Sequence, residues 1–234
     1  MDLRLRHRVN ELMDQPGLDE QLHRKALRGL RRVNWFSRSS RILWSAIREL
    51  AGRVERRPLR VLDIACGGGD VTVAIARRGQ RAGIEMQVDG CDISPVAVRH
   101  ARQQAEQVQP GVGFFELDAL SDPLPGDYDV LMCSLFLHHL DEADAVELLR
   151  RMSVATRHLL LVNDLRRTRW GYWLARWGSR VLTRSQIVHT DGPLSVSAAF
   201  TAEETLQLAR QAGIDHATLS QHWPQRFLFS WRRR

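Results

Sequence analysis

The chain has 234 residues, of which 44% are hydrophobic and 26% are charged. This length suits one α/β domain with an added helical segment, and the composition is that of a globular protein rather than a disordered or fibrous one. The three cysteines, Cys66, Cys91 and Cys133, are odd in number and lack a short repeated spacing. They therefore indicate neither a disulfide framework nor a zinc knuckle.

The formal net charge is +7 and the sequence pI is about 10.4. Clustered arginines could bind a polyanion, so a nucleic-acid partner is one interpretation. Lys25 is the only lysine among 34 basic residues, however, and such a skew is typical of genome base composition. We therefore expect no nucleic-acid partner.

The first ten residues alternate charge with leucine and do not resemble a secretory signal. No stretch approaches the roughly 18 consecutive apolar residues of a membrane span. We expect a soluble, cytoplasmic protein.

Residues 1–57 are predicted to form a helical segment. Apolar side chains recur every three or four residues in two runs, separated by residues 37–40. These side chains are Leu18, Leu22, Ala26, Leu30 and Val33, then Leu43, Ile47, Leu50 and Ala51. The helices either pack against the main domain or cover a ligand.

Residues 58–234 show short apolar strands alternating with helices, the pattern of βαβ units. The predicted strands are residues 60–65, 84–91, 112–116, 128–134, 158–162, 214–219 and 226–231. The connection between the last two is too short for a parallel crossover, so they should be antiparallel neighbours. The predicted fold class is α/β, with a seven-stranded, mostly parallel, Rossmann-like sheet whose last strand is antiparallel.

Several helix boundaries can also be predicted. Ser94 before Pro95 and Asp141 are N-cap candidates, and residues 201–204 form a capping box whose helix should close near Gly213.

A glycine-rich turn follows the first predicted strand, in residues 61–70. A strand, a tight turn and a helix place backbone N–H groups at the carboxyl edge of the sheet, where open α/β sheets bind ligands. Thr72 stands where a nicotinamide fingerprint needs its third glycine, and the P-loop lysine is missing. A different nucleotide-like ligand is therefore expected.

The spacing Asp63-x-Ala65-x-Gly67-x-Gly69 resembles the acidic, glycine-rich motif of class I S-adenosylmethionine-dependent methyltransferases, with alanine in place of the first glycine. Three further motifs support the resemblance, each at the end of a later predicted strand. They are Asp92-Ile93, Asp118-Ala119 and the run from Ser134 to His139, which is similar to the motif of ubiquinone- and menaquinone-biosynthesis methyltransferases.

The resemblance implies S-adenosylmethionine as cofactor. It places Asp63, Ala65 and Gly67 near the methionine portion, Asp92 near the ribose, and Asp118 with Ala119 near the adenine. The other expected cofactor contacts are Cys66, Gly69, Ile93 and Ser134. Other roles stay open.

Asp92 could instead cap the following helix, and Asp118 could belong to a turn before Asp122. Cys66 could be a reactive thiol at a helix N-terminus, but a small residue that fits the turn is the favoured interpretation.

The candidate catalytic residues are His139, His138 and Asp164, and we expect no metal. Both histidines follow the fourth predicted strand, at the edge where a methyl acceptor should enter. His139 could act as general base for a phenol, or it could line the pocket. Asp164 could orient the acceptor or a histidine, or cap a loop.

An insertion at about residues 166–198 contains Trp170, Tyr172, Trp173 and Trp177. It could cover an apolar acceptor, lie on a membrane surface, or pack against the N-terminal helices. Residues 191–195 and the N-terminal stretch resemble a bacterial methyltransferase group found beside polyketide enzymes.

The leading hypothesis is O-methylation of a small phenolic, polyketide or lipid-like compound, in secondary metabolism. The alternatives are an RNA methyltransferase and a non-catalytic, cofactor-binding regulatory protein. The motif that holds a flipped base in nucleic-acid amino-methyltransferases is replaced here by Ser134 and the residues after it, which disfavours the RNA alternative.

Overall fold

The computed structural model describes residues 2–9, 11–12, 19–55, 58–109 and 111–233. Its centre is a seven-stranded sheet in the order β3-β2-β1-β4-β5-β7-β6. The strands are β1 Leu59–Ile64, β2 Met86–Asp92, β3 Gly113–Glu116, β4 Val130–Ser134, β5 Leu159–Leu165, β6 Thr218–His222 and β7 Arg226–Arg232. The first five are parallel, and β7 runs antiparallel to β5 and to β6. The predicted fold class is confirmed.

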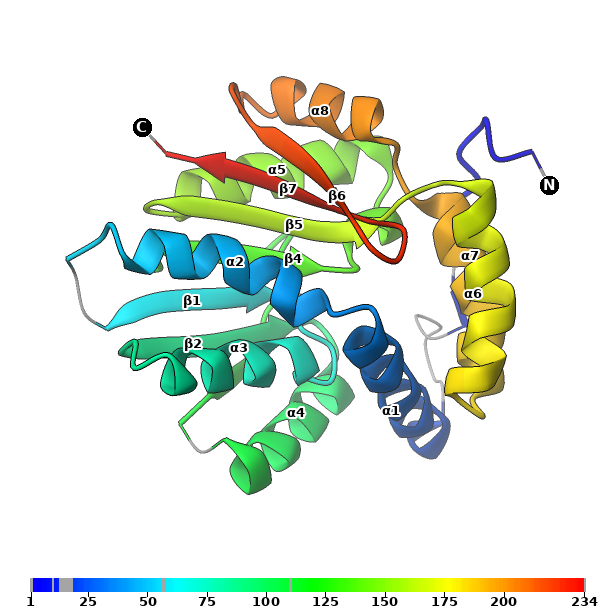
Figure 1. Ribbon diagram of the computed structural model, residues 1–234, viewed down its shortest axis with the longest axis horizontal. Helices are drawn as coiled ribbons and strands as arrows, with labels where there is room; N and C mark the ends of the chain where they lie inside the picture. Colours follow the sequence, from blue (N-terminus) through cyan, green and yellow to red (C-terminus); the bar gives the residue numbers. More distant parts are fainter. Residues whose placement is uncertain (1, 10, 13–18, 56–57, 110, 234) are drawn as a thin grey trace.

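Helices cover both faces of the sheet (Figure 1). They are α1 Glu20–Phe36, α2 Ser39–Ala51, α3 Asp70–Arg81, α4 Pro95–Val108, α5 Glu142–Ala155, α6 Arg169–Leu182, α7 Gln186–Ala198 and α8 Ala202–Gln211, with a 3-10 turn η2 at Leu137–His139. Helices α2, α3 and α4 lie on one face, and α5 and α8 lie on the other.

Alternate residues of each central strand supply the two cores, because successive side chains of a strand point to opposite faces. In β1, Leu59 and Val61 pack with α2, whereas Leu62 and Ile64 pack with α5 and α8. Burial on both faces explains why these strands are almost continuously apolar.

The predicted caps are also confirmed. Ser94 accepts a hydrogen bond from the N–H of Ala97, and Asp141 accepts one from the N–H of Asp144. Thr201 and Glu204 form the capping box of α8, and Gly213 beyond that helix has a positive φ of 75°. Strand ends differ from the prediction by a few residues, as in β5, which continues to Leu165.

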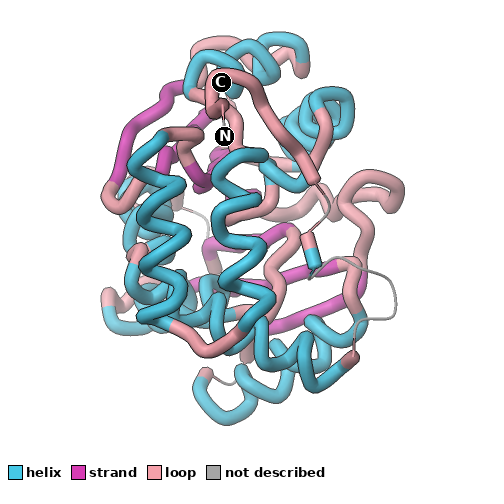
Figure 2. The backbone as a smooth tube through the Cα atoms, turned by 90° about the vertical axis from the view of Figure 1, so that its right-hand side faces the viewer, coloured by secondary structure: helices cyan, strands magenta, loops and turns pink. Residues whose placement is uncertain are grey.

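The N-terminal helices lie in two different environments. Helix α2 belongs to the core of the sheet, whereas α1 gathers with α6 and α7 at the carboxyl ends of the parallel strands (Figure 1). Figure 2 looks onto that side, with helices in front of the strands. On α1, Ala26 and Leu27 are buried but the predicted stripe residue Leu22 is exposed, and Leu18 lies outside the described residues.

The division at residue 57 between a helical segment and a methyltransferase domain stays a prediction. In the described part of the chain, no helix has both the length and the apolar character needed to cross a membrane.

Candidate functional site

The glycine-rich turn joins β1 to α3 in a conformation that its residue types explain. Ala65, Gly67 and Gly69 all have a positive φ, of 54°, 53° and 73°. At Gly69 a Cβ atom would lie 2.7 Å from the Phe114 ring, so a larger residue would displace that ring. The loop therefore needs small residues where the resemblance placed them.

Asp63, at the end of β1, lies beneath this turn. Its Oδ2 accepts a hydrogen bond of 2.7 Å from the Thr72 hydroxyl, and its Oδ1 is buried without a partner among the described residues. Burial raises the pKa of Asp63 to about 7, and the nearby carboxylates of Asp70 and Asp92 add to the rise. A buried, half-satisfied carboxylate is suited to a cationic ligand group.

Asp92, at the end of β2, ties the glycine turn to the next loop. Its Oδ2 accepts from the Gly67 N–H at 2.8 Å, and its Oδ1 accepts from the Ser94 N–H at 2.9 Å. The second bond shows that Asp92 does organise the start of α4, which was the alternative to a ribose contact. Ile93 beside it is 67% exposed, an apolar surface that a flat base could cover.

Asp118 uses its carboxylate within its own turn. It accepts from the N–H of Leu120 and from the hydroxyl of Ser121, and these bonds lower the pKa of Asp118. Ala119 is buried. The turn lies next to Asp92, because the Leu117 N–H donates to the Asp92 carbonyl at 3.1 Å. An adenine contact by Asp118 thus stays a prediction, and the turn role is visible.

The Cys66 thiol has the environment of a packing residue. Burial raises the pKa of Cys66 well above its ordinary value, with the carboxylates of Asp63 and Asp92 acting in the same direction. A Cβ on Gly90 would lie 2.9 Å from the Cys66 sulfur, so the thiol fills the space left by that glycine. This geometry favours a small turn residue over a reactive thiolate.

Helix α1 lies over the glycine turn, through residues that the sequence did not single out. A Cβ on Gly67 would lie 3.9 Å from Leu27 Cδ2, and one on Gly68 would lie 3.6 Å from Leu27 Cβ. Asn34 of the same helix has a buried side-chain oxygen without a partner in the described structure. Its side chain lies close to Asp70 at the start of α3, where it opposes the rise in the pKa of Asp70 that burial causes. Both residues border the candidate cofactor site.

Polar groups also gather at the carboxyl ends of β4 and β5, the strands on the other side of β1. The side-chain amide of Asn163 donates to the Ser134 hydroxyl at 2.8 Å, and the backbone carbonyl of Asn163 accepts from the N–H of Leu135. Leu135 has a φ of 60°, a strained conformation that turns the chain sharply into η2. The turn brings both predicted histidines towards β5.

His138 and Asp164 form a buried pair. The two residues are joined by a 2.7 Å contact from His138 Nδ1 to Asp164 Oδ1, and the His138 N–H donates to Asp164 Oδ2. Burial alone would lower the pKa of His138, but the carboxylates of Asp164 and Glu11 outweigh it and raise this pKa to about 10. The two facing carboxylates therefore favour the imidazolium form of His138.

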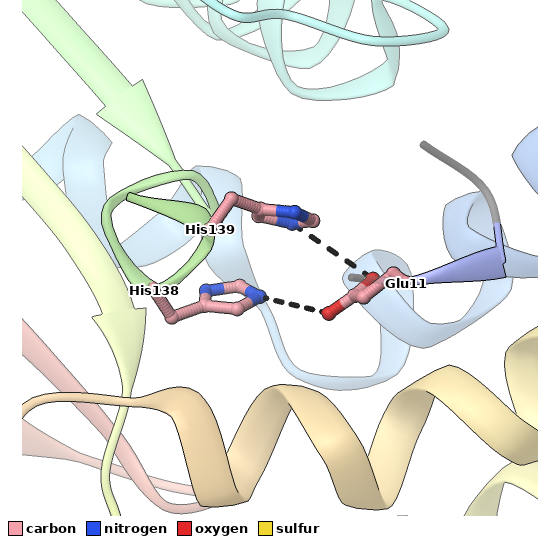
Figure 3. Close-up of side chains that lie close together, drawn as sticks. All are labelled: Glu11, His138 and His139. Carbon is pink, nitrogen blue, oxygen red and sulfur yellow. Dashed lines mark ion pairs between the residues drawn. The ribbon is translucent and has the colours of Figure 1, made fainter. Parts of the chain in front are cut away.

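Glu11 was not predicted, and no local pattern distinguishes it. Its Oε1 lies 3.6 Å from His138 Nε2, and its Oε2 lies 3.9 Å from His139 Nε2 (Figure 3). Glu11, His138 and His139 each offer one atom that could bind a metal, and these three atoms lie within 4.8 Å of one another. A divalent cation could also use this spacing. The structure thus brings together the three residues predicted to be catalytic, and Glu11 lies beside them.

Helix α6, in the insertion, exposes an apolar stripe. Its large exposed side chains are Trp170, Trp173, Leu174, Trp177 and Val181, spaced as on one helix face. Trp170 is 79% exposed and Val181 87%, so this face is largely open to solvent.

Comparison with known proteins identifies the fold and the domain. Residues 61–158 match the family model of a methyltransferase domain. The ubiquinone biosynthesis O-methyltransferase of Methylococcus capsulatus is 29% identical over 170 residues, which cover 72% of this chain and 65% of that protein. The enzyme of that name from Pseudomonas putida is 31% identical over 49% of this chain and 42% of its own length. The chain therefore spans about two thirds or less of these relatives.

Solved structures share the fold at low sequence identity. Magnesium protoporphyrin IX methyltransferase from Synechocystis, with bound S-adenosylhomocysteine, has a TM-score of 0.58 at 17% identity, covering 95% of this chain and 91% of its own. An O-methyltransferase family 2 protein from Planctomyces limnophilus, in complex with apigenin, has a TM-score of 0.57 at 17% identity, covering 85% and 62%.

The strand order is that of a Rossmann-like fold, and these solved methyltransferases share the fold. More specifically, the chain contains a class I S-adenosylmethionine-dependent methyltransferase domain and is distantly related to the ubiquinone biosynthesis O-methyltransferases. The residues present fit that cofactor. Asp63 has a buried oxygen without a partner in the described part of the chain, which would suit a cationic methionine portion, and one strand away lie the Asp92 carboxylate and the exposed side chain of Ile93.

Proposed function

We propose that this protein transfers the methyl group of S-adenosylmethionine to a hydroxyl of a small, apolar acceptor, such as a phenolic, polyketide or lipid-like compound. The observation that carries the proposal is the placement of two polar groups at one sheet edge. Asp63 and the glycine turn lie at the end of β1. The histidine pair, His138 and His139, follows β4, which is the neighbour of β1 in the sheet.

Within this proposal the chain has two tasks, alignment of the reactants and removal of a proton. The cofactor supplies an electrophilic methyl group, so catalysis depends chiefly on holding the acceptor oxygen in line with it. His139, the more exposed histidine of the pair, accepts the hydroxyl proton. His138 already carries its proton, so it acts as a positioning residue that Asp164 holds.

The acceptor class rests on the surroundings of the site. Helices α6 and α7 lie at the edge where an acceptor would enter, and α6 exposes three tryptophans. Such a surface favours an apolar compound over a charged one. Apigenin, bound by the structural neighbour from Planctomyces limnophilus, is a polyphenol of this general kind.

Helix α6 also supports a peripheral membrane contact. Arg169, Arg176, Arg180 and Arg184 are exposed on or just beyond this helix, next to its apolar stripe. Tryptophans and arginines on one amphipathic helix are typical of binding to an anionic lipid surface. This contact and a cytoplasmic location belong to the proposal.

Methyl transfer to a panel of phenolic and polyketide hydroxyl compounds tests the function, with S-adenosylhomocysteine formation as readout. S-adenosylhomocysteine should raise Tm, because a ligand selective for the native state stabilises it. Asp92→Ala should weaken cofactor binding by about 1.5–3 kcal/mol, the scale of hydrogen bonds to a charged group, whereas Asp215→Ala, at an exposed acid, should not.

Three results would contradict the proposal. Stabilisation by NADH instead of S-adenosylhomocysteine would exclude the cofactor. Salt-sensitive retention on RNA together with RNA methylation would favour a nucleic-acid substrate. Cofactor binding without turnover on any acceptor would favour a regulatory protein.

A further inference from the structure

Glu11 comes from the N-terminal segment, far in sequence from the residues that it faces. Its carboxylate is buried, with one oxygen directed at each imidazole of the histidine pair (Figure 3). Oε1 also accepts a hydrogen bond from the Ser195 hydroxyl of α7. Three separate parts of the chain, the N-terminal segment, η2 and α7, therefore meet at this carboxylate.

Described residues near Glu11 in the sequence also contact the turn that carries the histidines and helix α7. Arg6 donates to the carbonyls of His138 and Leu140, and Arg8 donates to the carbonyl of His139 at 2.6 Å. On the other side, the Leu12 N–H donates to Asp191 of α7 at 3.0 Å. These bonds hold the segment against η2, the turn that carries both histidines.

The cluster of Glu11, Asp164, His138 and His139 can accept one more proton without becoming positively charged. His138 lies between two carboxylates, with Nδ1 facing Asp164 and Nε2 facing Glu11. Two carboxylates and one imidazolium carry a net charge of −1, and a second imidazolium at His139 would neutralise it. The charged groups around the pair are Arg6 and Arg8 of the N-terminal segment, Glu142 of α5, Asp164 of β5, Asp191 of α7 and Arg226 of β7.

We propose that Glu11 is a positioning residue of the methyl-transfer site, which holds both imidazoles and balances the charge of the proton that His139 accepts. The proposal rests on the function proposed above. The transfer forms an oxygen–methyl bond, breaks the methyl–sulfur bond with its electron pair returning to sulfur, and leaves the hydroxyl proton on His139. The net charge of the cluster then changes from −1 to 0, and the proton passes to water as the product leaves.

The test compares Glu11→Gln with Glu142→Gln in the full chain. Glu142 pairs with Arg6 next to the cluster but faces neither imidazole, so it is the matched control. Glu11→Gln should lower kcat at least tenfold and move the rising limb of the pH–rate profile to lower pH, with an unchanged KM for S-adenosylmethionine. Glu11→Asp should restore part of both effects, and Glu142→Gln should match the wild type.

A second measurement does not need turnover. Glu11→Gln should make the His138 imidazolium lose its proton at lower pH in an NMR titration, because one of its two facing carboxylates is gone. A wild type that transfers no methyl group would remove the proposed function, and this titration would still decide whether Glu11 holds the imidazoles.

Two outcomes would overturn the role of Glu11. One is a Glu11→Gln variant with wild-type kcat, pH profile and His138 titration. The other is a stoichiometric divalent cation in the purified wild type, detected by elemental analysis and lost in Glu11→Gln but not in Glu142→Gln. In that case the three side chains would bind a metal and not a proton.

Discussion

Asp63 shows how a single carboxylate can be costly in the folded chain and useful to a ligand. The side chain is buried, and among the described residues only one of its two oxygens has a hydrogen-bond partner, the Thr72 hydroxyl. Burial favours the protonated form, so the pKa rises from 3.8 to about 7. A cationic ligand group beside the free oxygen would return the carboxylate to its charged form.

This pKa predicts how stability depends on pH. Between about pH 4 and pH 7 the folded chain keeps a proton on Asp63 that the unfolded chain has lost, so Asp63 lowers the free energy of unfolding as pH rises through that window. Asp63→Asn should remove this contribution, on the order of 2–4 kcal/mol across the window. Urea unfolding at several pH values measures it, with Asp215→Asn as control.

The outcome with ligand follows from the same reasoning. S-adenosylhomocysteine should bind the wild type more tightly as pH rises towards neutrality, and Asp63→Asn should lose that dependence. Parallel pH curves for wild type and variant would show that Asp63 does not face the ligand.

Kinetics can test whether His139 acts as the general base. His139→Ala should lower kcat on a phenolic acceptor by on the order of a hundredfold, with little change in KM for the cofactor, because a general base acts in the transition state. The matched control is His158→Ala, a partly exposed histidine that precedes β5 at the opposite end of the sheet. A variant that keeps its kcat and its pH profile would make His139 a wall of the pocket.

At the scale of elements, local sequence patterns predicted the strands and the helix caps, because short-range interactions determine both. The strands of the parallel sheet were predicted because burial on both faces makes them apolar, and caps such as Asp141 and Thr201 were predicted because the bond closes within three residues. The carboxylates at the ends of β1 and β2, Asp63 and Asp92, were predicted from their motifs.

The contacts of Glu11, Leu27 and Asn34 with the site could not be predicted in the same way. Each depends on where an N-terminal element lies after the chain has folded, and no periodic pattern encodes that position. Leu22 illustrates the opposite error, since it fits the helical stripe but remains exposed.

Helix α6 combines a buried attachment with an exposed apolar face. Thr168 caps its first turn and hydrogen-bonds Gln225 of the β6–β7 connection, so the helix is anchored to the sheet. If the exposed face guides an apolar acceptor, Trp173→Ala and Trp177→Ala should raise the acceptor KM several-fold and leave kcat nearly unchanged. Val154→Ala, at an exposed apolar residue of α5, is the control.

The same two variants separate acceptor binding from membrane contact. Loss of sedimentation with anionic vesicles, without a change in KM for a water-soluble phenol, would assign the face to lipid. If neither property changes, the stripe contributes to neither.

At the scale of the whole molecule, the two halves of the candidate site depend on the N-terminal region. Leu27 of α1 covers the glycine turn, and Glu11 of the preceding segment reaches the histidine pair. We therefore expect the N-terminal region to respond to the cofactor.

That response can be measured by hydrogen exchange. Amides of α1 near Leu27 should exchange more slowly when S-adenosylhomocysteine is bound, because a ligand held under the helix stabilises the contact of α1 with the glycine turn. Amides of α8, on the far face of the sheet, should change only if global unfolding is also suppressed. Leu27→Ala should weaken binding by on the order of tenfold, the scale of a lost buried apolar contact. Leu22→Ala, on the exposed side of the same helix, should bind as the wild type does. Equal affinity in both variants, with unchanged exchange in α1, would mean that α1 packs against the domain without covering the cofactor.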